Sequence, residues 1–180
     1  SFAKIERTIL DAIAASDDRV VIHQALQHLV VGGNALIFMG KEGLKLYPLN
    51  RYVIERDGNG DVIEIITKES INKDLIPDYD KIKPNVPYSM DEDEDSEECD
   101  VYTHVKRDNN RFVWHQEVHD KKLPGSQGKS PIDSTPWLPL RFNTVDGEAY
   151  GRGRVGQFIG DLKSLEALSQ AIVEGSAAAA

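Results

Sequence analysis

The sequence predicts an α+β protein with an N-terminal helical hairpin, an antiparallel β-sheet and a long C-terminal helix. Apolar residues recur at helical spacing near both ends of the chain. Short extended runs, joined by turns rich in Gly, Asp and Asn, fill the middle of the chain. The last helical pattern reaches the final residue without a Gly or Pro that would end it.

The first 31 residues predict two short helices, over 2–15 and 19–31. Apolar residues mark one face of each helix: Phe2, Ile5, Ile9, Ile22 and Leu26. The polar run at 16–18 separates the two helices and offers an N-cap to the second one. Gly32 and Gly33 are a typical C-terminal stop signal. Two short helices in succession predict a helical hairpin.

The middle of the chain predicts three β-hairpins. The expected strand pairs are 35–39 with 44–49, 52–56 with 62–67, and 101–106 with 111–118. Each pair is joined by a short run of turn-forming Gly, Asp or Asn residues. We expect all these strands, together with the apolar run 137–142, to form one antiparallel sheet.

Two segments lose periodicity and predict loops. Residues 91–100 are nearly all acidic, and like charges at this density repel one another and stay solvated. We therefore expect an acidic loop at 88–100 that is poorly ordered or fully exposed, because unpaired charges are not buried. Residues 119–136 contain Pro, Gly and Ser residues and predict a flexible loop.

A long helix is predicted from about residue 154 to the end of the chain. Its apolar stripe consists of Val155, Phe158, Leu162, Leu165 and Ile172, and further apolar positions widen it enough to contact two neighbours. We expect Val155, Phe158, Leu162 and Leu165 to be buried, partly against another copy of the protein. The alternative is that the stripe packs on the chain's own sheet. Because this helix has no stop signal, we expect an internal piece of a longer protein.

Composition excludes several classes of protein. The formal net charge of −9 argues against a protein that coats nucleic acid, since such proteins are basic. The one cysteine, Cys99, excludes an internal disulfide and fits a reducing compartment. No apolar run approaches the roughly 20 residues that span a bilayer, and no signal peptide is visible. A soluble protein assembled in the cytoplasm is expected.

The segment from Gly151 to Gly156 matches the pattern G-x-G-x-x-G and defines an alternative function, a nucleotide-binding enzyme domain. A dinucleotide site also needs a second parallel strand and an acidic residue about 20 positions later. The acidic residue at that position, Glu174, falls within the same predicted helix. The structural interpretation is that Gly151 and Gly153 turn the chain into the helix, while Gly156 permits close packing.

No metal, cofactor or catalytic site is predicted. The run from Asp57 to Asp61 begins like a calcium loop, but Val62 occupies the position where an EF-hand needs Gly. His115 and His119 have the spacing of helical neighbours but lie in an extended segment, where that spacing separates them. No arrangement typical of an enzyme is visible, and we expect no enzymatic activity.

A more specific signal comes from segments that cover most of the chain. They read SFAKIERTILDAIAASDDRVVIHQALQHLVVGGNALIFM, LYPLNRYVIERDGNGDVIEIITKESI, DVYTHV, PWLPLRF and DGEAYGRGRVGQFIGDLKSLEALSQAIVEGSAAA. The most specific pieces are YPLNRYVIERD and DGEAYGR with GDLKSLE. In this order the segments resemble the portal, or head-to-tail connector, protein of autographivirus-type short-tailed phages (podoviruses).

This resemblance implies a structural virion protein. Portals of this kind form a ring, a dodecamer, at one capsid vertex around a channel for double-stranded DNA. The packaging motor, terminase, docks on the ring while DNA enters, and the tail replaces it before ejection. The implied partners are therefore copies of the chain, DNA, terminase, capsid or scaffold proteins and tail proteins. The implied location is the capsid portal vertex, after assembly in the host cytoplasm.

The resemblance also divides the chain. Residues 1–150 would form an α/β wing, and 151–180 would form a stem-type or channel-proximal helix that packs against its copies and continues beyond the fragment. Arg152, Arg154 and Lys163 are the basic residues nearest this helix, and we expect them at subunit contacts or beside the channel. The acidic balance of the chain fits a channel that must not bind DNA phosphates strongly.

Overall fold

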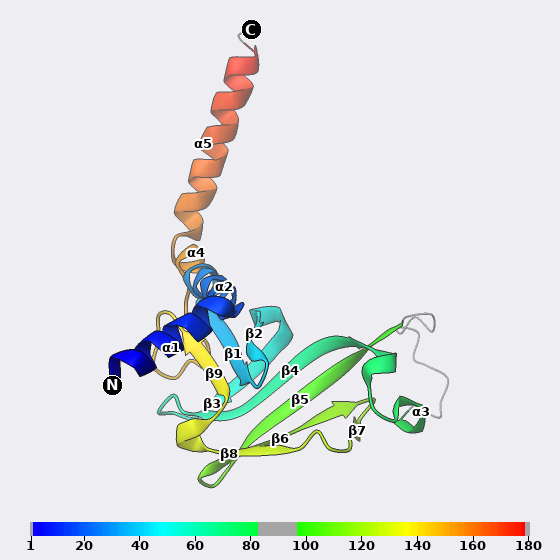
Figure 1. Ribbon diagram of the computed structural model, residues 1–180. Coiled ribbons are helices and arrows are strands. Elements are labelled where there is room, and N and C mark those ends of the chain that lie inside the picture. Colours follow the sequence, from blue (N-terminus) through cyan, green and yellow to red (C-terminus); the bar gives the residue numbers. More distant parts are fainter. Residues whose placement is uncertain (1, 83–96, 179–180) are drawn as a thin grey trace.

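The protein has an α+β fold, as predicted, with one helix projecting from a body of two helices and two sheets (Figure 1). The computed structural model describes residues 2–82 and 97–178. The helices and strands are α1 (Phe2–Ala15), α2 (Asp18–Gly32), β1 (Asn34–Gly40), β2 (Gly43–Tyr47), β3 (Tyr52–Arg56), β4 (Val62–Asn72), α3 (Tyr79–Ile82), β5 (Glu98–Asp108), β6 (Arg111–Val118), β7 (Lys121–Lys122), β8 (Gly128–Pro131), β9 (Trp137–Arg141), α4 (Arg154–Gln157) and α5 (Ile159–Ala178). Three 3₁₀ turns, η1 (Leu49–Arg51), η2 (Lys73–Leu75) and η3 (Ile132–Ser134), lie between strands in this described part.

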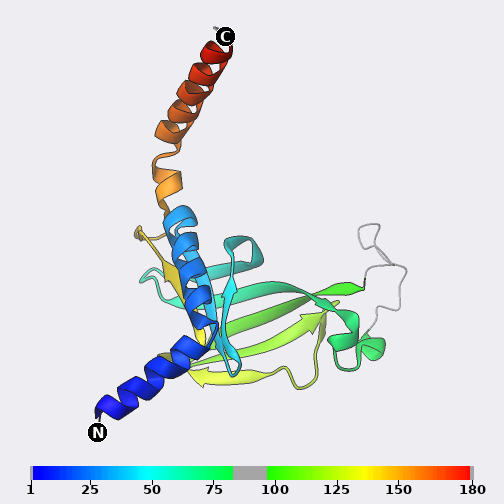
Figure 2. The ribbon, with the colours of Figure 1, turned by 45° about the horizontal axis from the view of Figure 1, so that its top comes forward.

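The two N-terminal helices are confirmed, and they meet at the polar run 16–18. Helix α1 leads away from this junction on the side opposite the course of α2 (Figure 2). The Ser16 hydroxyl accepts a hydrogen bond from the Asp18 amide at 3.4 Å. The Asp18 carboxylate in turn accepts the amide of Leu44 at 2.8 Å, which ties the start of α2 to β2. Gly33 ends α2 in the left-handed conformation, with φ at 81°, as its place in the sequence predicts.

The three predicted hairpins are confirmed, but the prediction of one sheet is wrong. Within the described residues, β2, β1 and β9 form a three-stranded sheet, while β3, β4, β5, β6 and β7 form a larger one, with β8 paired to β6. The separation arises at Pro48, which cannot donate to a strand ladder, and at the following turn Leu49–Arg51. The chain therefore changes sheet between β2 and β3 instead of folding β3 back onto β2.

The core lies between the two sheets. Its buried side chains are Leu36, Tyr47, Tyr52, Ile54, Ile65, Val105, Phe112 and Trp137. Helix α2 covers the other face of the small sheet, where Ala25 packs against Ala35 and Ile37. Strand β1 is thus covered on both faces, which explains why its sequence is a continuous apolar run.

Both predicted loops need correction. Residues 98–100 belong to β5, and Cys99 is buried there in a second cluster with Val101, Val118 and Leu123. The alternation of exposed and buried side chains lets this strand start within the acidic run, because Glu98 faces outward while Cys99 faces the core. Residues 88–96 lie outside the described residues. The segment 119–136 contains β7, β8 and a 3₁₀ turn, with Ser130 buried, so it is largely structured.

The predicted C-terminal helix is present but interrupted. Helix α4 ends at Gln157, and α5 starts at Ile159, so the prediction of one continuous helix from residue 154 is wrong. Phe158 lies at the break, with φ at −113° and ψ at 19°. Gly156 and Gly160 flank it, and each lowers helix propensity by about 1 kcal/mol relative to Ala. Two weak positions on either side of Phe158 explain why the break falls here.

Candidate assembly interface

Helix α5 makes no packing contact with the sheets of its own chain. It projects away from the body, and its C-terminal end is the most distant part of the described chain (Figures 1 and 2). Every residue from Ile159 to Ala178 is exposed. The alternative that the apolar stripe packs on the chain's own sheet is therefore wrong. An apolar surface of this length, left open by its own chain, is typical of an interaction site.

The predicted interface residues divide between the two helical segments. Val155 belongs to α4 and is 36% exposed, whereas Leu162 and Leu165 lie in α5 and are 44% and 60% exposed. Phe158, 47% exposed, links the segments: its amide donates to the Arg154 carbonyl at 3.1 Å, and its carbonyl accepts the Leu162 amide at 2.9 Å. All four side chains are available to a partner, and whether another copy buries them stays a prediction.

A close contact of main chains attaches this helical segment to the body. Built onto Gly153, a Cβ atom would lie 2.1 Å from the Val31 carbonyl oxygen, and one on Gly151 would lie 2.6 Å from the Gly33 carbonyl oxygen. One on Gly33 would lie 2.4 Å from the Arg152 main chain. Any side chain at these positions would push the end of α2 away from α4. We call residues 31–34 and 151–153 the glycine junction.

Asn34 holds the glycine junction together from inside. Its side chain is buried and mimics a peptide group opposite Gly151: the amide donates to the Gly151 carbonyl at 2.8 Å, and its oxygen accepts the Gly151 amide at 2.6 Å. The same amide also donates to the Gly32 carbonyl at 3.1 Å. These bonds satisfy buried main-chain groups that the irregular segment would otherwise leave unpaired.

Two further side chains hold the segment before the glycine junction against the large sheet. The Arg56 guanidinium donates to the carbonyls of Ala149, Gly60 and Pro139, at 3.1, 2.8 and 3.1 Å. Burial lowers the pKa of Arg56, and the nearby positive charge of Arg141 lowers it further. The Tyr150 hydroxyl accepts the Ile54 amide at 3.0 Å, which caps the edge of β3.

The sequence analysis missed Asn34, Arg56 and Tyr150. The partners of Asn34 and Gly151 are 117 positions apart, and those of Tyr150 and Ile54 are 96 apart. Nothing in the local pattern links such distant positions. The one usable signal is an amide side chain at Asn34, between a Gly-Gly helix stop and an apolar strand, where a polar residue needs an internal partner.

The three basic residues near the helix have different surroundings. Arg152 pairs with Glu148 through two hydrogen bonds, at 2.5 and 3.2 Å. The bond from Arg152 lowers the pKa of Glu148, and the bond to Glu148 raises the pKa of Arg152. The Arg154 guanidinium lies over the Phe142 ring, 5.6 Å from its centroid. Lys163 is exposed and has no hydrogen bond or ion pair within the described residues.

The geometry of the glycine segment does not support nucleotide binding. A phosphate-binding loop needs open space beside its glycines so that a phosphate can approach the main chain. At Gly151 and Gly153 that space is filled by residues 31–33. The expected tight turn at these two glycines is confirmed, but a Cβ on Gly156 would meet nothing within 4 Å, so close packing of Gly156 within the chain is wrong.

The turn at Asp57 also has a structural explanation. The Asp57 carboxylate accepts the amides of Asn59 and Asp61, each at 2.9 Å, which is an Asx-type turn. Two histidines on the large sheet are paired with glutamates, His104 with Glu64 and His115 with Glu117. Within residues 2–82 and 97–178, no group of three or more His, Cys, Asp or Glu side chains is arranged to hold a metal ion.

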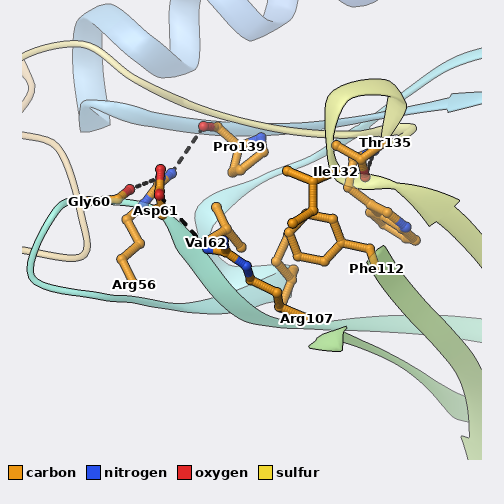
Figure 3. A pocket seen from close by; sticks show the side chains of 11 residues that line it. Arg56, Gly60, Asp61, Val62, Arg107, Phe112, Ile132, Thr135 and Pro139 are labelled. Atoms are coloured by element: carbon orange, nitrogen blue, oxygen red, sulfur yellow. Dashed lines mark hydrogen bonds and ion pairs between the residues drawn. The ribbon is translucent and has the colours of Figure 1, made fainter. Parts of the chain in front are cut away.

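A cavity of about 230 Å³ lies between the large sheet and the segment 132–139 (Figure 3). Arg56, Asp61 and Arg107 line its charged side, while Phe112 and Ile132 line its apolar side. The charged groups are engaged with their neighbours: Arg56 donates to two carbonyls here, and Arg107 lies 3.8 Å from Asp61. This cavity therefore belongs to the support of the two sheets.

Comparison with known proteins decides the family. A profile of the family described as "Bacteriophage head to tail connecting protein" matches residues 1–180. The chain belongs to this head-to-tail connecting protein family. The portal protein of Enterobacteria phage T3 is 37% identical over 179 residues, and that of Escherichia phage T7 is 36% identical over 180, each covering 96% of this chain. The portal protein of Pseudomonas phage phiKMV is 28% identical over 176 residues, or 94% of this chain.

The resemblance to podovirus portal proteins is therefore confirmed. This connector-family chain spans about a third of the length of the curated relatives, 33% for the T3 and T7 proteins and 34% for the phiKMV protein. None of the helices described in this chain is long and apolar enough to cross a membrane.

Proposed function

We propose that this chain is the wing and stem segment of a phage portal protein. The complete protein forms a ring at one capsid vertex, and double-stranded DNA is packaged and ejected through its channel. Residues 1–150 are the wing, and 151–180 are the stem helix. Membership of the connector family over the whole chain supports the portal role. The role is structural, so no catalytic residue is assigned.

The observation that carries the ring assembly is the exposed apolar stripe of α5. A helix that is open on all sides and carries large apolar side chains is stabilised when neighbours cover them. Copies of the same helix, arranged around a common axis, can provide that cover in a closed ring. A hollow of about 630 Å³ beside Val155 and Gly156, between α2 and α4, is also left open by the chain itself.

The finer parts of the proposal follow from the portal role. The ring is a dodecamer. The packaging motor, terminase, docks on it first, the tail follows, and capsid or scaffold proteins hold it at the vertex of the virion. Assembly takes place in the host cytoplasm. Among the basic residues, Arg152 and Arg154 are already engaged within the chain, which makes Lys163 the best candidate for a contact outside it.

Native mass spectrometry of the complete protein tests this function. The wild-type protein should give a large ring, and Leu162→Asp should lose it, because a carboxylate would be buried at the contact. Since Leu162 is exposed in the single chain, its free energy of unfolding should change by no more than about 0.5 kcal/mol. Gln170→Asp, on the polar side of α5, is the matched control and should keep the ring. A small wild-type particle that binds ATP or NAD would refute the proposal.

A further inference from the structure

Helix α5 has three different faces. At about 100° per residue, the large apolar side chains form one face: Ile159, Leu162, Leu165, Leu168, Ile172 and Val173. A second face carries small residues alone: Gly160, Ser164, Ala167, Ala171 and Gly175. The third face is polar, with Lys163, Glu166, Gln170 and Glu174. We call these the large face, the small face and the polar face.

We propose, on the basis of the portal ring above, that the large face of α5 in one copy packs against the small face of α5 in the next copy. A ring needs a contact between two different surfaces, because each subunit has one neighbour on either side. The large and small faces provide two such surfaces on a single helix. Their centres lie about 150° apart around the helix axis.

The angle between the faces suits a ring. In a ring of twelve helices that run near the common axis, the directions to the two neighbours also differ by about 150°, and rings of ten to fourteen come within about 6° of this value. The angle therefore fits a large ring without fixing its number of copies. In this arrangement the polar face points outward, and Asp161, at the boundary between the small and large faces, points toward the axis.

The small face is open and dry enough to receive apolar side chains. A Cβ built on Gly160 or on Gly175 would meet nothing within 4 Å, so a neighbouring helix can approach closely there. The Ser164 hydroxyl donates to the Gly160 carbonyl at 3.0 Å. On the large face, the Ser169 hydroxyl donates to the Leu165 carbonyl at 2.8 Å. Burying either serine against a neighbour therefore leaves no unpaired hydroxyl.

Charges at the borders of the two faces are complementary. Lys163 lies where the polar face meets the small face, and Glu166 lies where the polar face meets the large face. When the large face of one copy covers the small face of the next, Glu166 of the first approaches Lys163 of the second. Such border pairs set partner choice and register between helices. This charge complementarity identifies a second copy as the occupant.

Substitutions that fill the small face test the packing. Ala167→Leu and Ala171→Leu, made in the complete protein, keep a good helix former at exposed positions and should leave the thermal midpoint of the isolated subunit unchanged. Both should lower ring yield in native mass spectrometry by about tenfold or more, because the added side chain occupies the neighbour's place. Gln170→Leu places the same residue on the polar face and should keep ring yield within about twofold of wild type.

Mixing tests the charge pair between copies. Lys163→Glu and Glu166→Lys should each weaken the contact by about two- to fivefold, an effect that about 1 M salt removes. An equimolar mixture of the two variants should restore rings at low salt, with the variants alternating. Each variant chain still carries like charges at 163 and 166, so a pair formed within one helix would not be restored by mixing.

The outcomes separate this inference from the proposed function. A wild-type protein that forms no ring refutes the function itself. Rings that survive Ala167→Leu and Ala171→Leu overturn the packing of large on small face and leave the portal role standing. A lowered thermal midpoint of the isolated subunit in these variants would show that another part of the same chain covers the small face, and it would overturn the inference as well. Failure of the mixture to restore rings would overturn the charge pair.

Discussion

Gly153→Ala and Gly156→Ala are the same substitution three residues apart, and the structure predicts opposite effects. Gly153 has φ at −86° and ψ at 169°, a conformation that alanine adopts without strain. Its cost is therefore steric. The new Cβ would lie 2.1 Å from the Val31 carbonyl oxygen, at least about 1 Å inside ordinary contact, and the obstacle is main chain rather than a mobile side chain. At Gly156 the same Cβ would meet nothing within 4 Å.

The magnitudes follow from these geometries. Overpacking a close contact costs typically 1–3 kcal/mol, so we expect Gly153→Ala to lower the free energy of unfolding by about 2–3 kcal/mol. Gly156→Ala should raise it by up to about 1 kcal/mol, because alanine is the better helix former. Urea denaturation followed by circular dichroism measures both changes. Hydrogen exchange at residues 29–35 should show faster opening in Gly153→Ala alone. Equal effects of the two variants would refute the glycine junction.

Two further predictions concern the same region. Asn34→Ala should lower the free energy of unfolding by about 2–4 kcal/mol, because it leaves the buried amide and carbonyl of Gly151 unpaired; exposed Asn50→Ala is the control in the same urea titration, and equal effects would contradict the role of Asn34. Arg152→Ala should raise the pKa of Glu148 toward its ordinary value, measured by NMR titration of the carboxyl carbon. Since the pKa of Glu148 is lowered in the folded chain, the pair stabilises the fold above the unfolded pKa of Glu148 and is lost as pH falls through its folded value; an unchanged pKa of Glu148 would contradict the pairing.

The hairpins were predictable because their signals are local. The Gly40 to Gly43 turn and the Asp57 to Gly60 turn each join two neighbouring extended runs, and the structure pairs those runs in the expected way. The division into two sheets was not predictable in the same way. It depends on β9 returning to pair with β1 across about a hundred residues, where no sequence period gives the register.

The candidate interface was predicted in part for the same reason. The period of the apolar stripe shows that α5 needs neighbours, and the structure removes the chain's own sheet as one of them. The break at Phe158 was missed because the stripe continues through it, while the weak helix propensity of Gly156 and Gly160 acts only locally. The glycine junction was half predicted: the pattern indicates a tight turn, but residues 31–34, which fill the space beside it, are far away in sequence.

Main-chain contact at the glycine junction has a consequence for a ring. Helix α5 touches its own body only through α4 and residues 151–153, so the glycine junction sets the direction in which the stem leaves the wing. In a closed ring an angular error per subunit is repeated at each contact, and about 3° in each of twelve subunits would leave a gap of about 36°. Side chains change rotamer easily, whereas two main chains locked by Asn34 have no such freedom. Variation at the glycine junction should therefore affect ring closure more strongly than its cost in stability alone suggests.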